Sequence, residues 1–187
     1  MSTIDKDFVS RFIQHSNAIE GVTSAKAQES HMEAWEWLQD QEYITEEIII
    51  EAHKRIMEPL QPDVVGGYRN VRVRVGDSKP PHPEVVNECM NALVSQVPEP
   101  ETQLQCIIWH IHFENIHPFE DGNGRIGRLV YLYHCTKNDI QPIIWREDNK
   151  WAYYDLFDSK GEEISYNDYK TPWKDSMEHV ESEKFGF

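Results

Sequence analysis

The sequence has few cysteines and no long apolar run. Its three cysteines, Cys89, Cys106 and Cys135, form no C-x-x-C pair. Three thiols cannot build a disulfide framework, and each lies in a segment with helical spacing, so we expect reduced thiols in the core. No stretch has the length of a membrane-spanning helix, and the first residues lack the apolar centre of a signal peptide. These absences favour a soluble cytoplasmic protein without membrane partners.

Basic side chains are also scarce. The 187 residues include 18 Lys and Arg against 33 Asp and Glu, which gives a formal net charge of −15. A field of that sign repels nucleic acids and anionic membranes, so neither is expected as a general partner. It repels nucleotides too, so a phosphate site here needs a local excess of positive charge. A Walker motif and the glycine-rich loop of kinases are both absent.

Helical periodicity dominates what is present. A chain of 187 residues with 39% hydrophobic content can form one domain with a sizeable core. The helical segments are 5–20, 24–39, 45–58, 84–96, 101–116, 124–137 and 147–158. Valines that alternate with arginines over residues 71–75 have the period of a strand and predict a short hairpin. The expected fold is therefore all-α with one small β-hairpin.

The segment HPFEDGNGRIGRL, residues 117–129, concentrates chemically useful side chains. The glycines of the Gly-Asn-Gly turn at 122–124 let the backbone bring its N–H groups close to a ligand, where a helix begins. Arg125 and Arg128 lie three residues apart in the first turn of that helix. Bases at a helix N-terminus have the wrong sign for the helix dipole. They therefore indicate a bound polyanion, of which a polyphosphate is the obvious candidate.

An acid and an imidazole stand beside this anion site. Asp121 precedes the turn, and its hard oxygens next to phosphates suggest Mg²⁺. His117 ends the preceding helix, and histidine is the usual side chain for taking a proton near neutral pH. Together these groups suffice for phosphoryl or nucleotidyl transfer to a hydroxyl. The alternative, from the pattern alone, is an ordinary turn with surface arginines and a loop histidine.

The segment resembles the Fic signature H-x-F-x-[DE]-G-N-G-R-x-x-R and matches it at every specified position. GGYRNVRVRVGDSKPPHPEVV is similar to the Fic flap, and WAYYDLF is similar to the helix after the motif. These matches place residues 45–160 in the Fic core. The resemblance implies a largely helical fold and transfer of AMP from ATP to a protein hydroxyl.

The resemblance also implies roles for individual residues. His117 would be the general base, Phe119 the anchor of the loop and Asp121 the Mg²⁺ ligand. The nucleotide-binding residues would be Gly122, Asn123, Gly124, Arg125, Arg128 and, in the adenine pocket, Tyr154. The flap that would hold a target segment by strand addition is centred on Val71, Arg72 and Val73. After Tyr154 the sequence DSKGEE departs from the Asn-bearing segment of the family.

A second charge of the wrong sign closes the first helix. Ser16 and Glu20 are four residues apart on one face, and Glu20 lies just before Gly21, where a carboxylate opposes the helix dipole. A solvated surface glutamate is one interpretation of this spacing. SNAIEG also matches the Fic inhibitory pattern [ST]-x-x-x-E-[GN], in the class whose inhibitory helix is N-terminal. The resemblance implies that Glu20 pairs with Arg128 and blocks placement of the γ-phosphate.

We therefore expect one Fic-type domain over residues 1–187, with an inhibitory helix at 5–21, a core at 45–160 and a C-terminal extension at 161–187. The expected function is a protein adenylyltransferase that its own N-terminal helix inhibits. Removal of AMP from a modified protein, kinase-like phosphotransfer and non-enzymatic nucleotide binding stay open as alternatives. The expected partners are ATP with Mg²⁺ and an unidentified target protein, for which the chain itself is one candidate. The sequence leaves open whether copies assemble into a homo-oligomer.

Overall fold

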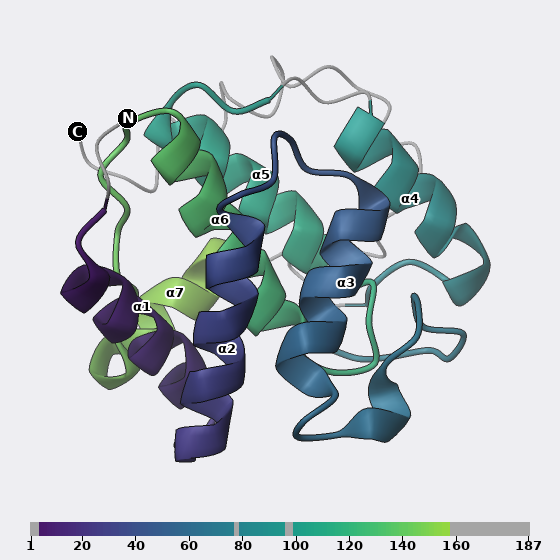
Figure 1. Ribbon diagram of the computed structural model, residues 1–187. Helices are drawn as coiled ribbons and strands as arrows, with labels where there is room; N and C mark the ends of the chain where they lie inside the picture. The colour runs from purple at the N-terminus through teal and green to yellow at the C-terminus, as the bar shows by residue number, and fades with distance from the viewer. Residues whose placement is uncertain (1–3, 77–78, 96–98, 158–187) are drawn as a thin grey trace.

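The computed structural model describes residues 4–76, 79–95 and 99–157 (Figure 1). Its α-helices in this part of the chain are α1 Lys6–Ile19, α2 Ala25–Leu38, α3 Glu46–Met57, α4 Pro83–Ser95, α5 Gln103–Ile116, α6 Asn123–Lys137 and α7 Lys150–Tyr154. Short 3₁₀ helices cover Pro62–Val64, Glu147–Asn149 and Asp155–Phe157. The last expected helix is thus divided into three short pieces, and the expected extension at 161–187 lies outside the described residues.

Side-chain caps begin several of these helices. Ser24 accepts a hydrogen bond from the Ala27 N–H at 3.2 Å, and Thr45 accepts one from the Ile48 N–H at 3.2 Å. Thr102 begins α5 with a reciprocal capping box. Each cap satisfies an N–H group that the helix itself leaves without a partner. The helix starts expected at Ser24 and Thr45 are confirmed.

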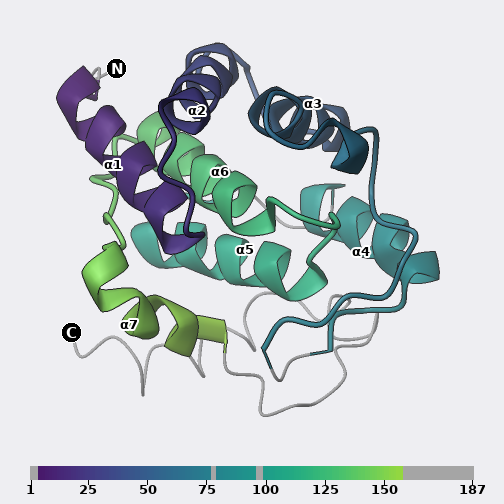
Figure 2. The same cartoon turned by 90° about the horizontal axis from the view of Figure 1, so that it is seen from below.

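Helices α5 and α6 form the centre of the fold (Figure 2). Every residue of α6 from 125 to 135 is buried. A helix that is buried all round must be covered on every side. Helix α1 packs against α6 and α2, α3 packs against α2 and α6, and α4 packs against α5. The loop that joins α5 to α6 carries the motif, so both central helices fix its position.

The segment between α3 and α4 differs from the expectation. Its described residues form no β-strand, and only isolated bridges occur, at Val75 and Lys79. The expected β-hairpin is therefore wrong in this part of the chain. The valine alternation is real, but it buries no face, because Val71 and Val75 are 45% and 37% exposed. An alternating pattern favours a strand only where one face of the strand is buried.

The described helices include none with the length and apolar character needed to cross a membrane.

Candidate functional site

His117 stands at a sharp bend where α5 ends. Its backbone is left-handed, with φ 49° and ψ 62°. Such a conformation is uncommon outside glycine and is found at functional sites where neighbouring contacts hold it. The His117 N–H still donates to the Phe113 carbonyl at 2.9 Å, and the His117 carbonyl accepts from Arg69 Nε at 2.7 Å. The bend is thus fixed by hydrogen bonds on both sides of the residue.

The His117 imidazole is neutral at physiological pH. Its side chain is 17% exposed, and its Nδ1 lies 3.9 Å from Glu114 Oε2. Burial lowers the pKa of His117 to about 4. Burial likewise raises the pKa of Glu114 to about 8, against the attraction of Arg128 and with help from the negative charge of Glu20. A neutral imidazole can accept a proton, which is what the predicted role of a general base requires.

The Gly-Asn-Gly turn is held from inside the protein. Gly122 is left-handed, with φ 83°. The Asn123 side chain bonds to Phe119 twice, accepting from its N–H at 2.8 Å and donating to its carbonyl at 2.9 Å. The Phe119 ring is fully buried and stacks on His53 with 3.8 Å between ring centroids. His53 Nε2 lies 2.9 Å from the Asp121 carbonyl oxygen, so the whole loop is anchored.

Arg128 lies in the core and is 1% exposed. Its Nε donates to Ser16 Oγ at 2.9 Å, and its Nη2 donates to the Ser16 carbonyl at 2.8 Å and to Glu20 Oε1 at 2.7 Å. Its Nη1 donates to the Tyr153 hydroxyl at 2.9 Å. The two charges of wrong sign, Glu20 and Arg128, therefore form an ion pair, as the resemblance implied.

The Glu20 carboxylate also covers the N-terminus of α6. A Cβ atom built on Gly124 would overlap Glu20 Oε1 and approach Arg128 Nη1. The first N–H groups of α6 point out of the helix here, because no preceding turn supplies acceptors for them. An anion therefore already occupies the place that the sequence assigned to an anion, and this anion is part of the chain.

Arg125 and Asp121 form the second charged pair of the turn. Arg125 is 3% exposed, and its Nη2 lies 3.7 Å from Asp121 Oδ1. Arg125 Nε is buried without a hydrogen-bond partner among the described residues. Asp121 is 48% exposed and accepts from the Gly122 N–H at 2.6 Å. A buried donor without a partner calls for an acceptor from outside the chain.

The donor set fits Mg²⁺ held jointly with a ligand. Mg²⁺ prefers oxygen ligands, keeps several waters, and is usually bound by one or two carboxylates together with substrate phosphates. Asp121 supplies such a carboxylate at the edge of the turn. No cluster of three or more acidic, histidine or cysteine side chains able to hold a metal occurs in the part of the chain that the structure describes.

The two adjacent tyrosines of α7 have different places. Tyr154, expected in an adenine pocket, is 39% exposed, and its hydroxyl donates to the Ile19 carbonyl at 3.4 Å. Tyr153 is buried, and its hydroxyl joins Arg128 Nη1 to His110 Nε2, each at 2.9 Å. Burial keeps the pKa of His110 well below 6.5. Sequence reasoning missed Tyr153, because either tyrosine of WAYYDLF could face inward.

The expected docking residues lie beside the bend at His117. Val71 is 45% exposed, Arg72 is exposed and Val73 is partly buried. Arg69, just before them, donates from its backbone N–H to the Pro118 carbonyl at 2.8 Å. The segment is therefore attached to the loop that carries His117. Sequence reasoning missed Arg69, because it precedes the alternating stretch and no local pattern marks it.

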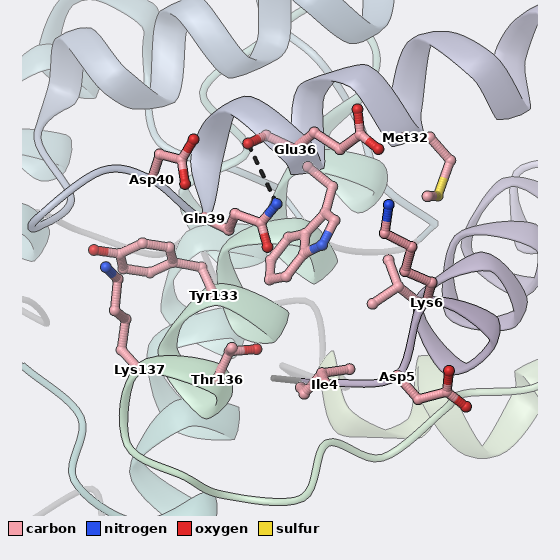
Figure 3. A pocket seen from close by; sticks show the side chains of 12 residues that line it. Ile4, Asp5, Lys6, Met32, Glu36, Gln39, Asp40, Tyr133, Thr136 and Lys137 are labelled. Atoms are coloured by element: carbon pink, nitrogen blue, oxygen red, sulfur yellow. Dashed lines mark hydrogen bonds between the residues drawn. The ribbon is translucent and has the colours of Figure 1, made fainter. Parts of the chain in front are cut away.

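A separate groove of about 870 Å³ lies at the other end of α6 (Figure 3). It is lined by the N-terminal end of α1, the C-terminal half of α2 and residues Tyr133, Thr136 and Lys137 of α6. At 1.5 Å per residue, these positions lie roughly 15–20 Å along α6 from the Gly-Asn-Gly turn. The groove therefore does not belong to the site around His117.

Comparison with known proteins gives a family match and similar solved structures. Residues 43–135 match the model of the Fic/DOC family. Protein adenylyltransferase Fic from Nematostella vectensis is 36% identical over 123 residues, which are 63% of this chain and 29% of that protein. The Aedes aegypti protein of the same name is 30% identical over 119 residues, 61% of this chain and 24% of that protein.

The chain thus spans less than a third of the length of these curated relatives. Among solved structures, a Fic-domain-containing signalling protein from Bacteroides thetaiotaomicron has a TM-score of 0.75 at 20% identity, covering 94% of this chain and 81% of that one. This likeness shows the fold. The family match covers α3 to α6 and the loops between them, whereas α1 lies outside it.

Proposed function

Residues 43–135 form a domain of the Fic/DOC family, and from this premise we propose that the chain transfers AMP from ATP to a hydroxyl side chain of a target protein and is inhibited by α1. The observation that carries the proposal is the Glu20 carboxylate, which lies on Arg128 at 2.7 Å over the N-terminus of α6. On this proposal the carboxylate lies where the phosphates would bind, so it would oppose their binding.

The nucleotide phosphates bind at the start of α6 on this proposal. The N–H groups of the turn and the partial positive charge of the helix N-terminus favour an anion there. Arg125 offers its unpartnered Nε, and Arg128 offers the donor that Glu20 now uses. Asp121 would hold Mg²⁺ against the phosphates, where the ion neutralises part of their charge.

His117 is the base in the proposed reaction. The target hydroxyl oxygen bonds to the α-phosphorus, the bond from that phosphorus to the α–β bridging oxygen breaks, and pyrophosphate leaves. The hydroxyl proton passes to Nε2 of His117, because Nδ1 faces Glu114 at 3.9 Å. The lowered pKa of His117 keeps the imidazole free of a proton until the hydroxyl supplies one.

The target segment docks along Val71, Arg72 and Val73 in this proposal. These residues adjoin the His117 loop and have no strand partner among the described residues. An incoming extended segment could pair with their backbone groups, which is a common mode of peptide recognition. Docking there would bring a target hydroxyl to the imidazole.

Inhibition acts through the Glu20 side chain, while α1 stays in place. Val9, Phe12, Ile13 and Ile19 of α1 are each 3% exposed or less. Burying one such side chain is worth about 1.5–3 kcal/mol, so separating α1 would cost roughly 6–12 kcal/mol. That is comparable with the stability of a whole domain, about 5–15 kcal/mol. Glu20 is 33% exposed and follows the last helical residue, so its side chain can turn away alone.

The test is incorporation of label from ATP that carries ³²P on either the α- or the γ-phosphate. Glu20→Gly should incorporate more α-label into the chain than wild type, by roughly 5- to 150-fold for an ion pair worth about 1–3 kcal/mol. Adding Arg128→Ala should cancel the gain, because the phosphate then lacks the arginine that would bind it. Glu58→Gly is the matched control, since Glu58 is an exposed cap at the C-terminus of α3.

The other outcomes separate the alternatives. Incorporation of γ-label would indicate a kinase. Release of α-label from a chain that had been modified beforehand, without new incorporation, would indicate removal of AMP. Equal and low labelling in wild type and Glu20→Gly would contradict inhibition by α1, and strong labelling in the double variant would contradict the phosphate role of Arg128.

A further inference from the structure

Arg69 is a buried cation outside the segment 117–129 that carries the Fic signature. Its residue is 4% exposed, and its guanidinium donates to four backbone carbonyls. Nε donates to His117 at 2.7 Å, Nη1 to Val71 at 3.0 Å, and Nη2 to Pro81 at 2.7 Å and to Ile116 at 3.3 Å. Four of its five N–H groups therefore have a partner.

Two of these acceptors are the terminal carbonyls of α5. Ile116 is the last residue of the helix, and His117 is its left-handed cap. The last carbonyls of a helix lack partners within it, and the helix dipole favours a positive charge at that end. Arg69 meets both demands from a distant part of the chain. It therefore holds the left-handed bend at which the imidazole stands.

The other two acceptors belong to the segment between α3 and α4. Val71 lies near the middle of that segment, which spans residues 58–82, and Pro81 lies near its end. The Arg69 backbone adds a further link, because its N–H donates to the Pro118 carbonyl at 2.8 Å. One residue thus joins two points of the segment, at Val71 and Pro81, to the loop that carries His117. Figure 2 shows the segment passing the end of α5 where this loop begins.

We propose that Arg69 is a positioning residue, which fixes the docking segment at Val71–Val73 and the His117 bend as one rigid unit. The docked target hydroxyl then meets the imidazole at a set distance. The inference rests on the proposed transfer reaction, and it assigns Arg69 no contact with ATP or with the target. Lysine cannot replace Arg69. Its single ammonium group cannot reach the carbonyls that the planar guanidinium contacts on different sides.

The first test uses the Glu20→Gly chain as the active parent. Arg69→Lys in that parent should lower the rate of α-label incorporation at saturating ATP by about 10- to 100-fold, the scale expected when reacting groups are displaced by about 1 Å. The dissociation constant for a fluorescent ATP analogue should stay within about twofold, because the phosphate site contains none of the Arg69 contacts. Arg74→Lys is the matched control, since exposed Arg74 donates to the Gly76 carbonyl in the same segment.

The second test needs no activity. Hydrogen exchange in the Glu20→Gly chain should show one common opening free energy for the Arg69 and His117 amides, which bond to Pro118 and Phe113. Arg69→Lys should raise exchange in peptides 66–76 and 116–122 together. If Arg69→Lys fails to fold, the common opening in the parent remains the test.

Several results would overturn the inference. These are an unchanged rate in Arg69→Lys, a loss of ATP affinity equal to the loss of rate, or exchange that rises in only one of the two peptides. In the Glu20→Gly parent, a tenfold or greater difference between the protection factors of the Arg69 and His117 amides would also overturn it. A parent that incorporates no α-label contradicts the proposed function instead, and leaves the exchange tests of Arg69 in force.

Discussion

Lowering the pH from 7.5 to 5.5 should remove much of the folding stability of this domain, because burial keeps six of its histidines neutral. Burial lowers the pKa of His31 and His134 to about 3 and of His53, His112 and His117 to about 4, and it keeps the pKa of His110 well below 6.5. In the unfolded chain each of these side chains titrates near 6.5. The unfolded state therefore binds more protons, and stability falls as the pH drops through 6.5.

The size of the loss follows from proton linkage. Each histidine that is neutral when folded and titrates at about 6.5 when unfolded loses about 1.3 kcal/mol between pH 7.5 and 5.5. The exact folded pKa matters little, since the folded form takes up almost no proton in this range. Six such groups lose roughly 8 kcal/mol. Glu114 opposes the histidines, because its raised pKa of about 8 lets the folded state hold a proton that the unfolded state lacks in this pH range.

The net loss of stability is comparable with the whole stability of a typical domain. Glu114 returns roughly 2–3 kcal/mol over the same range, which leaves a net loss of about 5 kcal/mol. Domains of this kind are stable by about 5–15 kcal/mol, so the loss takes the fold close to its limit. Urea unfolding followed by tryptophan fluorescence at pH 7.5, 6.5 and 5.5 measures it, with an unchanged m-value as the check that both states stay the same.

The His134→Gln variant sharpens this measurement. The substitution removes one buried titrating group that has no role in the proposed reaction. The free energy of unfolding of the variant should therefore fall by about 1.3 kcal/mol less than that of wild type between pH 7.5 and 5.5. A free energy of unfolding that stays level from pH 7.5 to 5.5 and falls only where carboxylates titrate would refute the reasoning. The histidines would then carry protons in the fold.

Three further variants test the site. His117→Ala should lower α-label incorporation by about 10²- to 10⁴-fold with ATP affinity nearly intact, because the imidazole acts on the hydroxyl; an unchanged rate in a filter assay would move the base elsewhere. Asp121→Ala should remove the Mg²⁺ dependence of ATP binding seen by calorimetry, and a normal dependence would transfer the metal ligand to another acid. Tyr153→Phe should cost about 1–3 kcal/mol in urea unfolding, because it leaves Arg128 Nη1 without its buried acceptor, and a cost no greater than that of Tyr154→Phe would contradict this.

The fold was predictable where local signals agree with packing. Ser24 and Thr45 cap helices as expected, since a capping side chain needs only the backbone that follows it. The hairpin failed for the opposite reason. Alternation at Val71 and Val75 predicts a strand only if some other element covers one face, and nothing in the local sequence reports whether such an element exists. The Arg69 side chain holds the Val71 and Pro81 carbonyls instead, which no strand period can reveal.

The site divides in the same way, and the charges explain the division. Glu20 and Arg128 each break the helix-dipole rule at their own helix end, so each predicts a missing partner of opposite sign. The dipole rule alone names no partner; the resemblance to the Fic inhibitory pattern implied that Glu20 pairs with Arg128, 108 positions away. Arg69 breaks no local rule, because it lies outside any helix. The demand that it satisfies belongs to the carbonyls of Ile116 and His117, and every helix has such carbonyls. Only the folded chain shows which side chain reaches them. The sequence around Arg69 therefore does not predict that Arg69 bonds to the backbone at the end of α5.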